Sequence, residues 1–203
     1  MRSIQNFING EFVAAESGKR FDKRSPLDNR VIASIAEAGR PEVDAAVKAA
    51  RAALTGEWGG LSTDQRVELL YGVANEITRR FDDFVEAEMA DTGQPHHVMT
   101  HAFIPRGAAN FKVFADVVKN VPSESFQTPT PDGRGALNYS IRVPKGVVGV
   151  ISPWNAPFLL MTWKVGPALA CGNTVVVKPS EETPLTTTLL GEVMNAVGIP
   201  KGV

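Results

Sequence analysis

The sequence of 203 residues has little of what marks several classes of protein. It contains one cysteine, Cys171, so no disulfide can form within the chain, as is typical of a reducing compartment. Its net charge is −1, and no basic run is interleaved with aromatic residues, which argues against a nucleic-acid surface. No apolar run approaches a membrane span, and the start lacks the apolar region of a signal peptide. We expect a cytoplasmic protein that binds neither nucleic acid nor membrane.

What remains is an ordinary globular composition, with 43% hydrophobic and 21% charged residues. Residues 1–122 predict a hairpin at Asn9-Gly10, a dipeptide favoured in type I′ turns, and a strand at 31–36. Helical periodicity then begins at Pro41 and at Ser62, where Gln65 completes a capping box. Further helices are expected over 82–92, ending at Gly93, and over 98–119, where Pro105 predicts a kink or a restart.

The middle of the chain predicts a β arm over residues 123–144. Its first half is polar and rich in turn residues, and residues 136–143 then form a predicted strand that ends at Pro144. We expect this arm to be separate from the helices that precede it.

Residues 145–203 predict a strand-helix-strand-helix series. The strands at 147–152 and 174–177 are short, apolar and β-branched, as expected for strands buried on both faces. The helices are expected at 158–170, buried on most sides, and at 184–197. This alternation is typical of an α/β fold with a parallel sheet and right-handed crossovers.

Asn155 follows the first of these strands, in the run Pro153-Trp154-Asn155. Ligands of open α/β sheets bind at the carboxyl ends of the strands, so its amide N–H can stabilise an oxyanion that develops on a carbonyl. The alternative is an N-cap of the next helix, a position that asparagine suits well.

Lys178, Ser180 and Glu181 follow the second strand, in the run Lys178-Pro179-Ser180-Glu181. A lysine and a carboxylate at a strand end can contact the two hydroxyls of a ribose. The alternative is a solvated loop. No G-x-G-x-x-G motif is present in the sequence.

The order of these motifs resembles the cofactor half of the NAD(P)-dependent aldehyde dehydrogenases. The resemblance implies the N-terminal part of that fold: an incomplete parallel Rossmann-like sheet with flanking helices, and a β arm used for oligomerisation. It implies that Asn155 binds the oxyanion, whereas the family's nucleophilic cysteine and general-base glutamate are expected beyond residue 203. Cofactor contacts are implied at Ile151, Ser152, Pro153, Trp154, Lys178, Ser180 and Glu181. A carboxylate at Glu181 would repel a 2′-phosphate, which favours NAD over NADP.

Several segments look like one subgroup of the family, the 2-hydroxymuconic semialdehyde dehydrogenases. They are Asp91-Thr92-Gly93-Gln94-Pro95, residues 104–112, residues 130–133 and residues 149–155. The resemblance implies a small acidic semialdehyde as substrate and a homo-oligomeric parent enzyme. Arg106 is the candidate partner for the substrate carboxylate, with a surface salt bridge as the alternative. Trp163 is expected in the core, or in the wall of the aldehyde tunnel.

Two other features invite functional interpretations that we do not favour. Cys171 is expected to be a buried, inert thiol rather than a nucleophile. His97 and His101 have a spacing that permits a shared metal, but a solvated helix face is the simpler interpretation, and no metal is expected. The chain on its own is therefore expected to be inactive. A non-catalytic fragment and a stand-alone nucleotide-binding or assembly module are the alternative functions.

Overall fold

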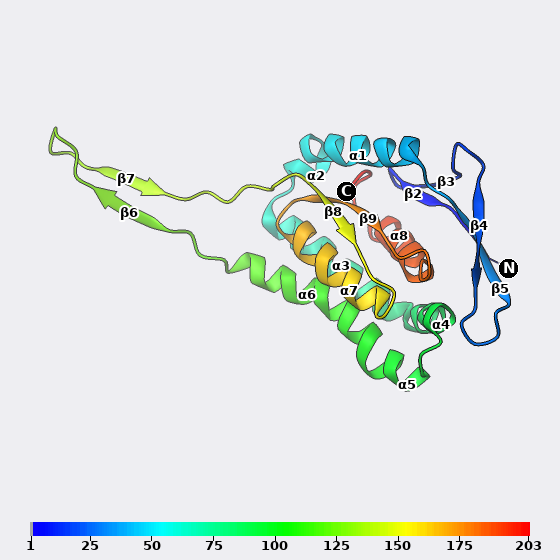
Figure 1. The fold of residues 1–203 in the computed structure, drawn as a ribbon. Helices are drawn as coiled ribbons and strands as arrows, with labels where there is room; N and C mark the ends of the chain where they lie inside the picture. The colour runs from blue at the N-terminus through cyan, green and yellow to red at the C-terminus, as the bar shows by residue number, and fades with distance from the viewer. Residues whose placement is uncertain (1) are drawn as a thin grey trace.

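The computed structural model describes residues 2–203, and the chain begins with five short strands (Figure 1). They are β1 (Arg2–Ile4), β2 (Asn6–Ile8), β3 (Glu11–Val13), β4 (Arg20–Arg24) and β5 (Val31–Ala36). The predicted hairpin is confirmed: β2 and β3 pair in antiparallel fashion, and Asn9 and Gly10 both have positive φ angles. The other three strands form a sheet in the order β1-β5-β4, of which only β5 was predicted.

Four helices follow: α1 (Arg40–Thr55), α2 (Glu57–Gly60), α3 (Thr63–Arg79) and α4 (Phe81–Thr92). The predicted capping box of α3 is present, because the Ser62 hydroxyl accepts from the Gln65 N–H and the Gln65 side chain accepts from the Ser62 N–H. Gly93 ends α4 in the left-handed conformation, as predicted. The short helix α2 was not predicted.

The next helical stretch contains a π-helical turn between two α-helical segments. It runs through α5 (His96–Val98), a π-helical turn at Met99–Phe103 and α6 (Ile104–Lys119). Pro105 lies in the first turn of α6, directly after the π-helical turn, and the backbone of Phe103 and Ile104 before it is already right-handed helical. The sequence predicted a kink or a restart at this proline, and the structure instead has a π turn directly before it, within a helical stretch that continues without a break.

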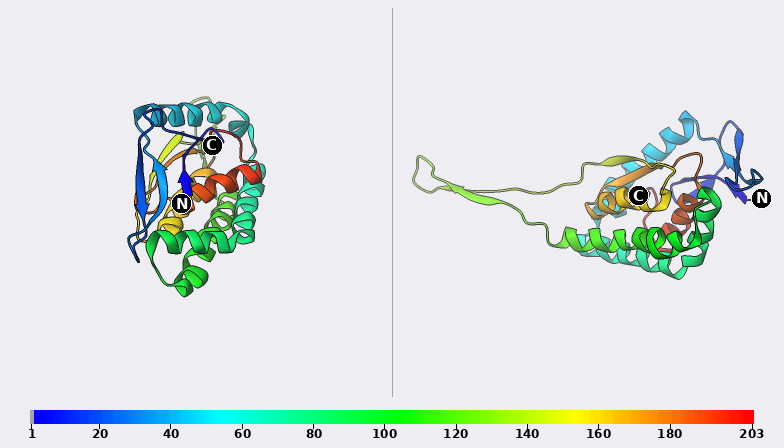
Figure 2. Two further views of the ribbon diagram at one scale, coloured as in Figure 1. Left: turned by 90° about the vertical axis from the view of Figure 1, so that its right-hand side faces the viewer. Right: turned by 60° about the horizontal axis from the view of Figure 1, so that its bottom comes forward.

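The strands β6 (Ser125–Thr128) and β7 (Ala136–Tyr139) form a two-stranded antiparallel ribbon that extends far from the helices (Figures 1 and 2). The predicted strand at 136–143 is too long, since residues 140–143 have no strand partner within residues 2–203. Large apolar side chains on this ribbon are exposed, among them Phe126, Leu137 and Tyr139.

The last part of the chain is the predicted strand-helix-strand-helix unit. It consists of β8 (Val147–Ile151), α7 (Pro157–Ala170), β9 (Thr174–Lys178) and α8 (Leu185–Val197), and the two strands pair in parallel. The expectation that both strands are buried on both faces is wrong. Val150 is buried, but Ile151 is 72% exposed and β9 is mostly half-buried. Each strand has one neighbour in the described residues, and α1 and α7 cover the pair only in part.

The main core lies where α3, α6 and α7 pack together. Phe158 of α7 is fully buried and its ring lies against α6 at Gly107, where an added Cβ would come within 2.4 Å of a ring carbon. Trp58 is also fully buried, and its indole N–H donates to the carbonyls of Gly172 and Asn173. The strand-helix unit therefore rests on a helical base that comes earlier in the sequence.

Candidate functional site

The two motifs singled out in the sequence lie at one edge of the parallel sheet. Ile151 is paired with Lys178 in the register of β8 and β9, and the Ser152 N–H donates to the Lys178 carbonyl at 3.2 Å. The runs that begin at Ser152 and Lys178 therefore leave neighbouring strands at their carboxyl ends, the position where ligands of open α/β sheets bind.

Asn155 lies in the turn between β8 and α7, and its side chain is exposed to solvent. The N-cap of α7 is Ala156, and no side chain caps this helix, so the N-cap alternative for Asn155 is wrong. Trp154 is 64% exposed beside it, whereas Ser152 and Ala156 are buried. Within residues 2–203 the Asn155 amide makes no hydrogen bond, which leaves its N–H donors available to a ligand.

Lys178 and Glu181 form an ion pair, with 2.9 Å between the ammonium and a carboxylate oxygen. Both side chains are well exposed. The N–H of its own residue and the Lys178 ammonium hold the pKa of Glu181 below its usual range, so its carboxylate is charged at neutral pH. Ser180 is buried, and its hydroxyl accepts from the Glu182 N–H, which fixes the turn that presents the ion pair.

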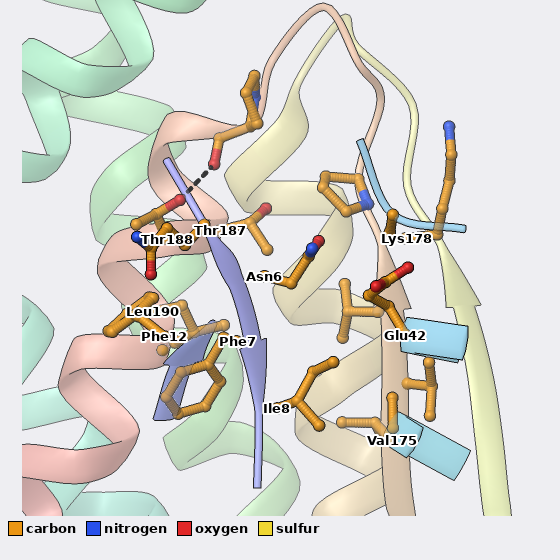
Figure 3. A pocket seen from close by; sticks show the side chains of 18 of the residues that line it. Asn6, Phe7, Ile8, Phe12, Glu42, Val175, Lys178, Thr187, Thr188 and Leu190 are labelled. Atoms are coloured by element: carbon orange, nitrogen blue, oxygen red, sulfur yellow. Dashed lines mark hydrogen bonds between the residues drawn. The ribbon is translucent and has the colours of Figure 1, made fainter. Parts of the chain in front are cut away.

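A cavity of about 670 Å³ opens beside β9, between this strand, the β2–β3 hairpin, α1 and α8 (Figure 3). Its walls are largely apolar, with Phe7 and Ile8 of the hairpin facing Val175 and Leu190. The polar groups that line it include Asn6, Glu42, Lys178, Ser180 and Glu181. A volume of this size and a mostly apolar wall with a few polar groups are typical of small-molecule sites.

Two polar side chains of this cavity differ in whether their hydrogen-bonding groups have partners. Both Glu42 oxygens accept from backbone N–H groups, of Glu16 at 2.7 Å and Gly39 at 2.6 Å, and these bonds hold the pKa of the Glu42 carboxyl below its usual range. By contrast, the Asn6 amide nitrogen is buried and has no partner within residues 2–203. A buried donor left unpaired costs free energy, so a ligand that accepts a hydrogen bond here would be favoured.

The two candidate substrate residues do not line this cavity. Arg106 lies in the first turn of α6, is exposed, and has no ion pair within the described residues, so the surface salt bridge is not formed. Trp163 is 52% exposed on α7, and the expectation that it belongs to the core is wrong. The buried face of α7 is formed by residues such as Phe158, Met161 and Val165. Trp163 lies outside this face and points outward.

Cys171 also differs from expectation, since its thiol is exposed rather than buried. It is the C-cap residue of α7, one position past the last helical turn, where the side chain no longer faces the core. His97 and His101 are both exposed, and the His97 carbonyl lies 3.0 Å from the His101 ring nitrogen. Residues 2–203 contain no group of three or more potential metal ligands.

No helix in the same range is long and apolar enough to cross a membrane.

Sequence reasoning missed two buried carboxyl groups on α4, those of Glu88 and Asp91. A Glu88 oxygen accepts from the Phe158 N–H at 3.2 Å, and an Asp91 oxygen accepts from the Leu185 N–H at 2.8 Å. Each acid thus binds the N-terminus of one of the two helices that follow the parallel strands. The signal was present in the sequence, because both acids fall at helical spacing from Phe84, on the face that the helix buries.

Burial dominates the electrostatics of this pair. It raises the pKa of Glu88 to about 7 and that of Asp91 to about 8, although the backbone N–H bonds act in the opposite direction. The Lys23 ammonium is itself buried, donates to the backbone carbonyl of Asp91 at 3.1 Å, and favours the charged form of the Asp91 carboxyl.

Comparisons with known proteins agree with this arrangement. A model of the aldehyde dehydrogenase family matches residues 12–203. The chain is 66% identical over 203 residues to a 2-hydroxymuconic semialdehyde dehydrogenase of Pseudomonas sp. (strain CF600), covering all of this chain and 42% of that protein. It is 57% identical over 203 residues to a 2-aminomuconic 6-semialdehyde dehydrogenase of Pseudomonas sp., with 100% and 41% covered.

The fold comparison gives the same answer. The structure of an NAD⁺ complex of a Bacillus cereus aldehyde dehydrogenase matches with a TM-score of 0.93 and 37% identity, over 99% of this chain and 40% of that one. The chain spans about two-fifths of the length of these relatives, and its mixed α/β fold matches their N-terminal part. Since the family model covers nearly all of the sequence, the chain belongs to the aldehyde dehydrogenase family.

Proposed function

We propose that this chain is the N-terminal part of an NAD-dependent dehydrogenase that oxidises an acidic semialdehyde to the carboxylate. The preferred substrate is 2-hydroxymuconic semialdehyde or a close analogue. The observation that carries the proposal is the pair of motifs at the carboxyl ends of β8 and β9, with Asn155 leaving one strand and the Lys178–Glu181 ion pair leaving the other. The substrate class is supported by the relative that is 66% identical, which is a 2-hydroxymuconic semialdehyde dehydrogenase.

The residues beside β9 suit the adenosine half of NAD. An apolar cavity accepts a purine ring, the unpaired Asn6 amide can donate to one of its nitrogens, and Lys178 and Glu181 can bind the two ribose hydroxyls. Ile151, Ser152, Pro153 and Trp154 would lie along the cofactor at the end of β8, and Ser180 would hold the turn. The bound nicotinamide supplies the acceptor for the hydride of the substrate.

Asn155 is the group in this chain that would act on the reacting atoms. A thiolate that attacks an aldehyde generates an oxyanion, and an amide N–H aimed at that oxygen stabilises it without reorganisation. The exposed and unpaired amide of Asn155 can make that bond, with the thiolate and the general base supplied by the rest of the parent protein. Arg106 would pair with the substrate carboxylate, and Trp163 would line the path to the site.

We further propose that the parent enzyme is a cytoplasmic homo-oligomer assembled through the β6–β7 ribbon. The exposed apolar side chains of this ribbon, with Phe126 at 62% and Leu137 at 66% exposure, favour burial against another surface. The proposed small-molecule partners are the aldehyde and NAD.

The proposed activity is tested with the full-length protein, by following NADH absorbance with 2-hydroxymuconic semialdehyde. We expect rapid NADH formation that Asn155→Ala slows by about 100- to 1,000-fold, the cost of removing one oxyanion donor. The binding constant for NAD should be unchanged, because the amide acts on the substrate. Oxidation at the wild-type rate by the Asn155→Ala variant would remove Asn155 from the mechanism. Residues 1–203 alone should form no NADH.

A further inference from the structure

The turn that carries Asn155 is held by a side chain from a distant part of the sequence. The Gln94 side-chain amide donates a hydrogen bond to the backbone carbonyl of Asn155, with 2.8 Å between nitrogen and oxygen. These residues are 61 positions apart, and Gln94 is the only residue whose side chain bonds to Asn155 within residues 2–203. The function derived above does not use Gln94.

The end of α4 places Gln94 for this contact. Gly93 adopts a left-handed conformation, its N–H donates to the Met89 carbonyl, and the Gln94 N–H then donates to the Thr92 hydroxyl. A Cβ added at Gly93 would lie 3.0 Å from a side-chain carbon of Pro26, and the φ angle of +69° is unfavourable for any other residue. The turn therefore needs glycine. The backbone of Gln94 is therefore fixed by local bonds and does not depend on its contact with Asn155.

The two ends of the Asn155 turn are held independently. At its start, the Ser152 N–H donates to Lys178 and the Lys164 ammonium donates to the Ile151 carbonyl. At its end, the buried Glu88 carboxyl accepts from the Phe158 N–H. Between these anchors Trp154 and Asn155 are exposed and lack support from the core. The bond from Gln94 therefore acts on the part of the turn that is otherwise free to rotate.

We propose that Gln94 is a positioning residue for Asn155, an inference that rests on the oxyanion role proposed above. The carbonyl that Gln94 binds belongs to the peptide unit between Asn155 and Ala156, so the bond fixes the ψ angle of Asn155. With the helix end held by Glu88, that angle determines the direction of the Asn155 side chain. An oxyanion donor acts over a narrow range of about 2.7–3.1 Å, so a small rotation of this peptide unit weakens the catalytic hydrogen bond.

The test is a double-mutant cycle in the full-length enzyme, read as the single-turnover rate of NADH formation. Gln94→Leu keeps a similar size and removes the donor. We expect it to slow hydride transfer by about 10- to 100-fold, the cost of a misplaced catalytic group. In the Asn155→Ala background the same change should alter the rate by less than about twofold, because the group that Gln94 positions is gone.

Gln94→Lys is the rescue variant, since its ammonium restores a donor at similar reach. It should recover most of the rate lost in Gln94→Leu. NAD binding and the melting temperature should match the wild type in the single variants, which a general loss of structure would not allow.

The outcomes separate the inference from the proposed function. Equal losses from Gln94→Leu with and without the Asn155 amide would overturn the positioning role while leaving the oxyanion role intact. Failure of Gln94→Lys to recover any activity would also overturn it. A wild-type rate for Asn155→Ala would instead remove the oxyanion role, and the inference with it.

Discussion

The Glu88 carboxyl accepts a hydrogen bond from the backbone N–H of Phe158 at 3.2 Å, and both residues are completely buried. The bond joins α4 to the first turn of α7, the helix that follows the Asn155 turn. Asp91, one helical turn later on α4, makes the matching bond to the Leu185 N–H at the start of α8. One face of α4 thus binds the N-termini of both helices of the strand-helix unit, where unpaired N–H groups favour an acid.

Glu88→Gln should change how stability depends on pH. Burial raises the pKa of Glu88 from about 4.5 in the unfolded chain to about 7 in the folded protein. The folded state therefore binds more protons between these values, and its stability falls as pH rises through this window. Glutamine keeps the acceptor for Phe158 but cannot ionise. Between pH 4.5 and 8, the free energy of unfolding of the wild type should fall by up to about 3 kcal/mol more than that of the variant. Urea unfolding at each pH measures this difference.

The matched control is Glu86→Gln, an exposed carboxyl on the same helix. Its stability curve should run parallel to that of the wild type. Asp91 remains in all three proteins, and burial raises its pKa to about 8, so some decline with pH persists in each. Parallel curves for Glu88→Gln and the wild type would show that Glu88 is not ionised by this pH change.

Features that depend on contacts between residues close in sequence were predicted from the sequence, whereas features that depend on distant contacts were not. The turn at Asn9-Gly10 and the cap at Ser62 were predicted correctly because their bonds join residues a few positions apart. The pairing of β1 with β5 joins residues about thirty positions apart and left no local signal. The hydrogen-bond partners of Glu88 and Gln94 lie 70 and 61 positions later, so local sequence could not identify these bonds, although the spacing of Glu88 from Phe84 indicated that its side chain is buried.

Burial was predicted least well. Ile151 and Trp163 are apolar by type but exposed, because burial depends on which elements cover a face and not on the residue alone. Cys171 shows the same effect at a helix end, where one further position along the chain moves the side chain from the core to the surface.

Gly107→Ala should destabilise the packing of α6 against α7. The new methyl group would lie 2.4 Å from the Phe158 ring, which is fully buried and cannot move freely. Overpacking of this kind costs about 1–3 kcal/mol, which should appear as a lower melting temperature. Gly60→Ala is the control, since nothing lies within 4 Å of the added atom. An unchanged melting temperature for Gly107→Ala would mean that the two helices separate readily.

Glu181→Gln should weaken the preference for NAD over NADP. The charged carboxylate would repel a 2′-phosphate, and its removal eliminates a like-charge contact worth about 1 kcal/mol in water, roughly a fivefold gain in NADP affinity. Titration of each cofactor by fluorescence measures the ratio. Glu182→Gln removes an exposed charge one position away and should leave the ratio unchanged. The same change in both variants would point to net charge instead of a specific contact.

Leu137→Asp should shift the full-length protein towards smaller assemblies. Leu137 is 66% exposed on the ribbon, so a carboxylate is tolerated in the separate subunit but would be buried without a partner in an interface. Size-exclusion chromatography with light scattering measures the mass. Gln127 is paired with Leu137 on the neighbouring strand, and Gln127→Asn, which keeps the amide, should preserve the assembly. An unchanged mass for Leu137→Asp would place the interface elsewhere.

Arg106→Ala should discriminate between acidic and neutral aldehydes. The guanidinium lies in the first turn of α6, is exposed, and has no ion pair within residues 2–203, so it is available to a substrate carboxylate. Arginine binds a carboxylate through two parallel hydrogen bonds, and the loss of a charged bond costs about 1.5–3 kcal/mol. We expect kcat/KM for 2-hydroxymuconic semialdehyde to fall by about 10- to 100-fold, mostly through KM, while a neutral aldehyde is oxidised as before. Lys112→Ala removes an exposed cation from the same helix and controls for the overall field. Equal losses on both aldehydes would give Arg106 a structural role, because a residue that recognises only the carboxylate cannot affect a substrate that lacks one.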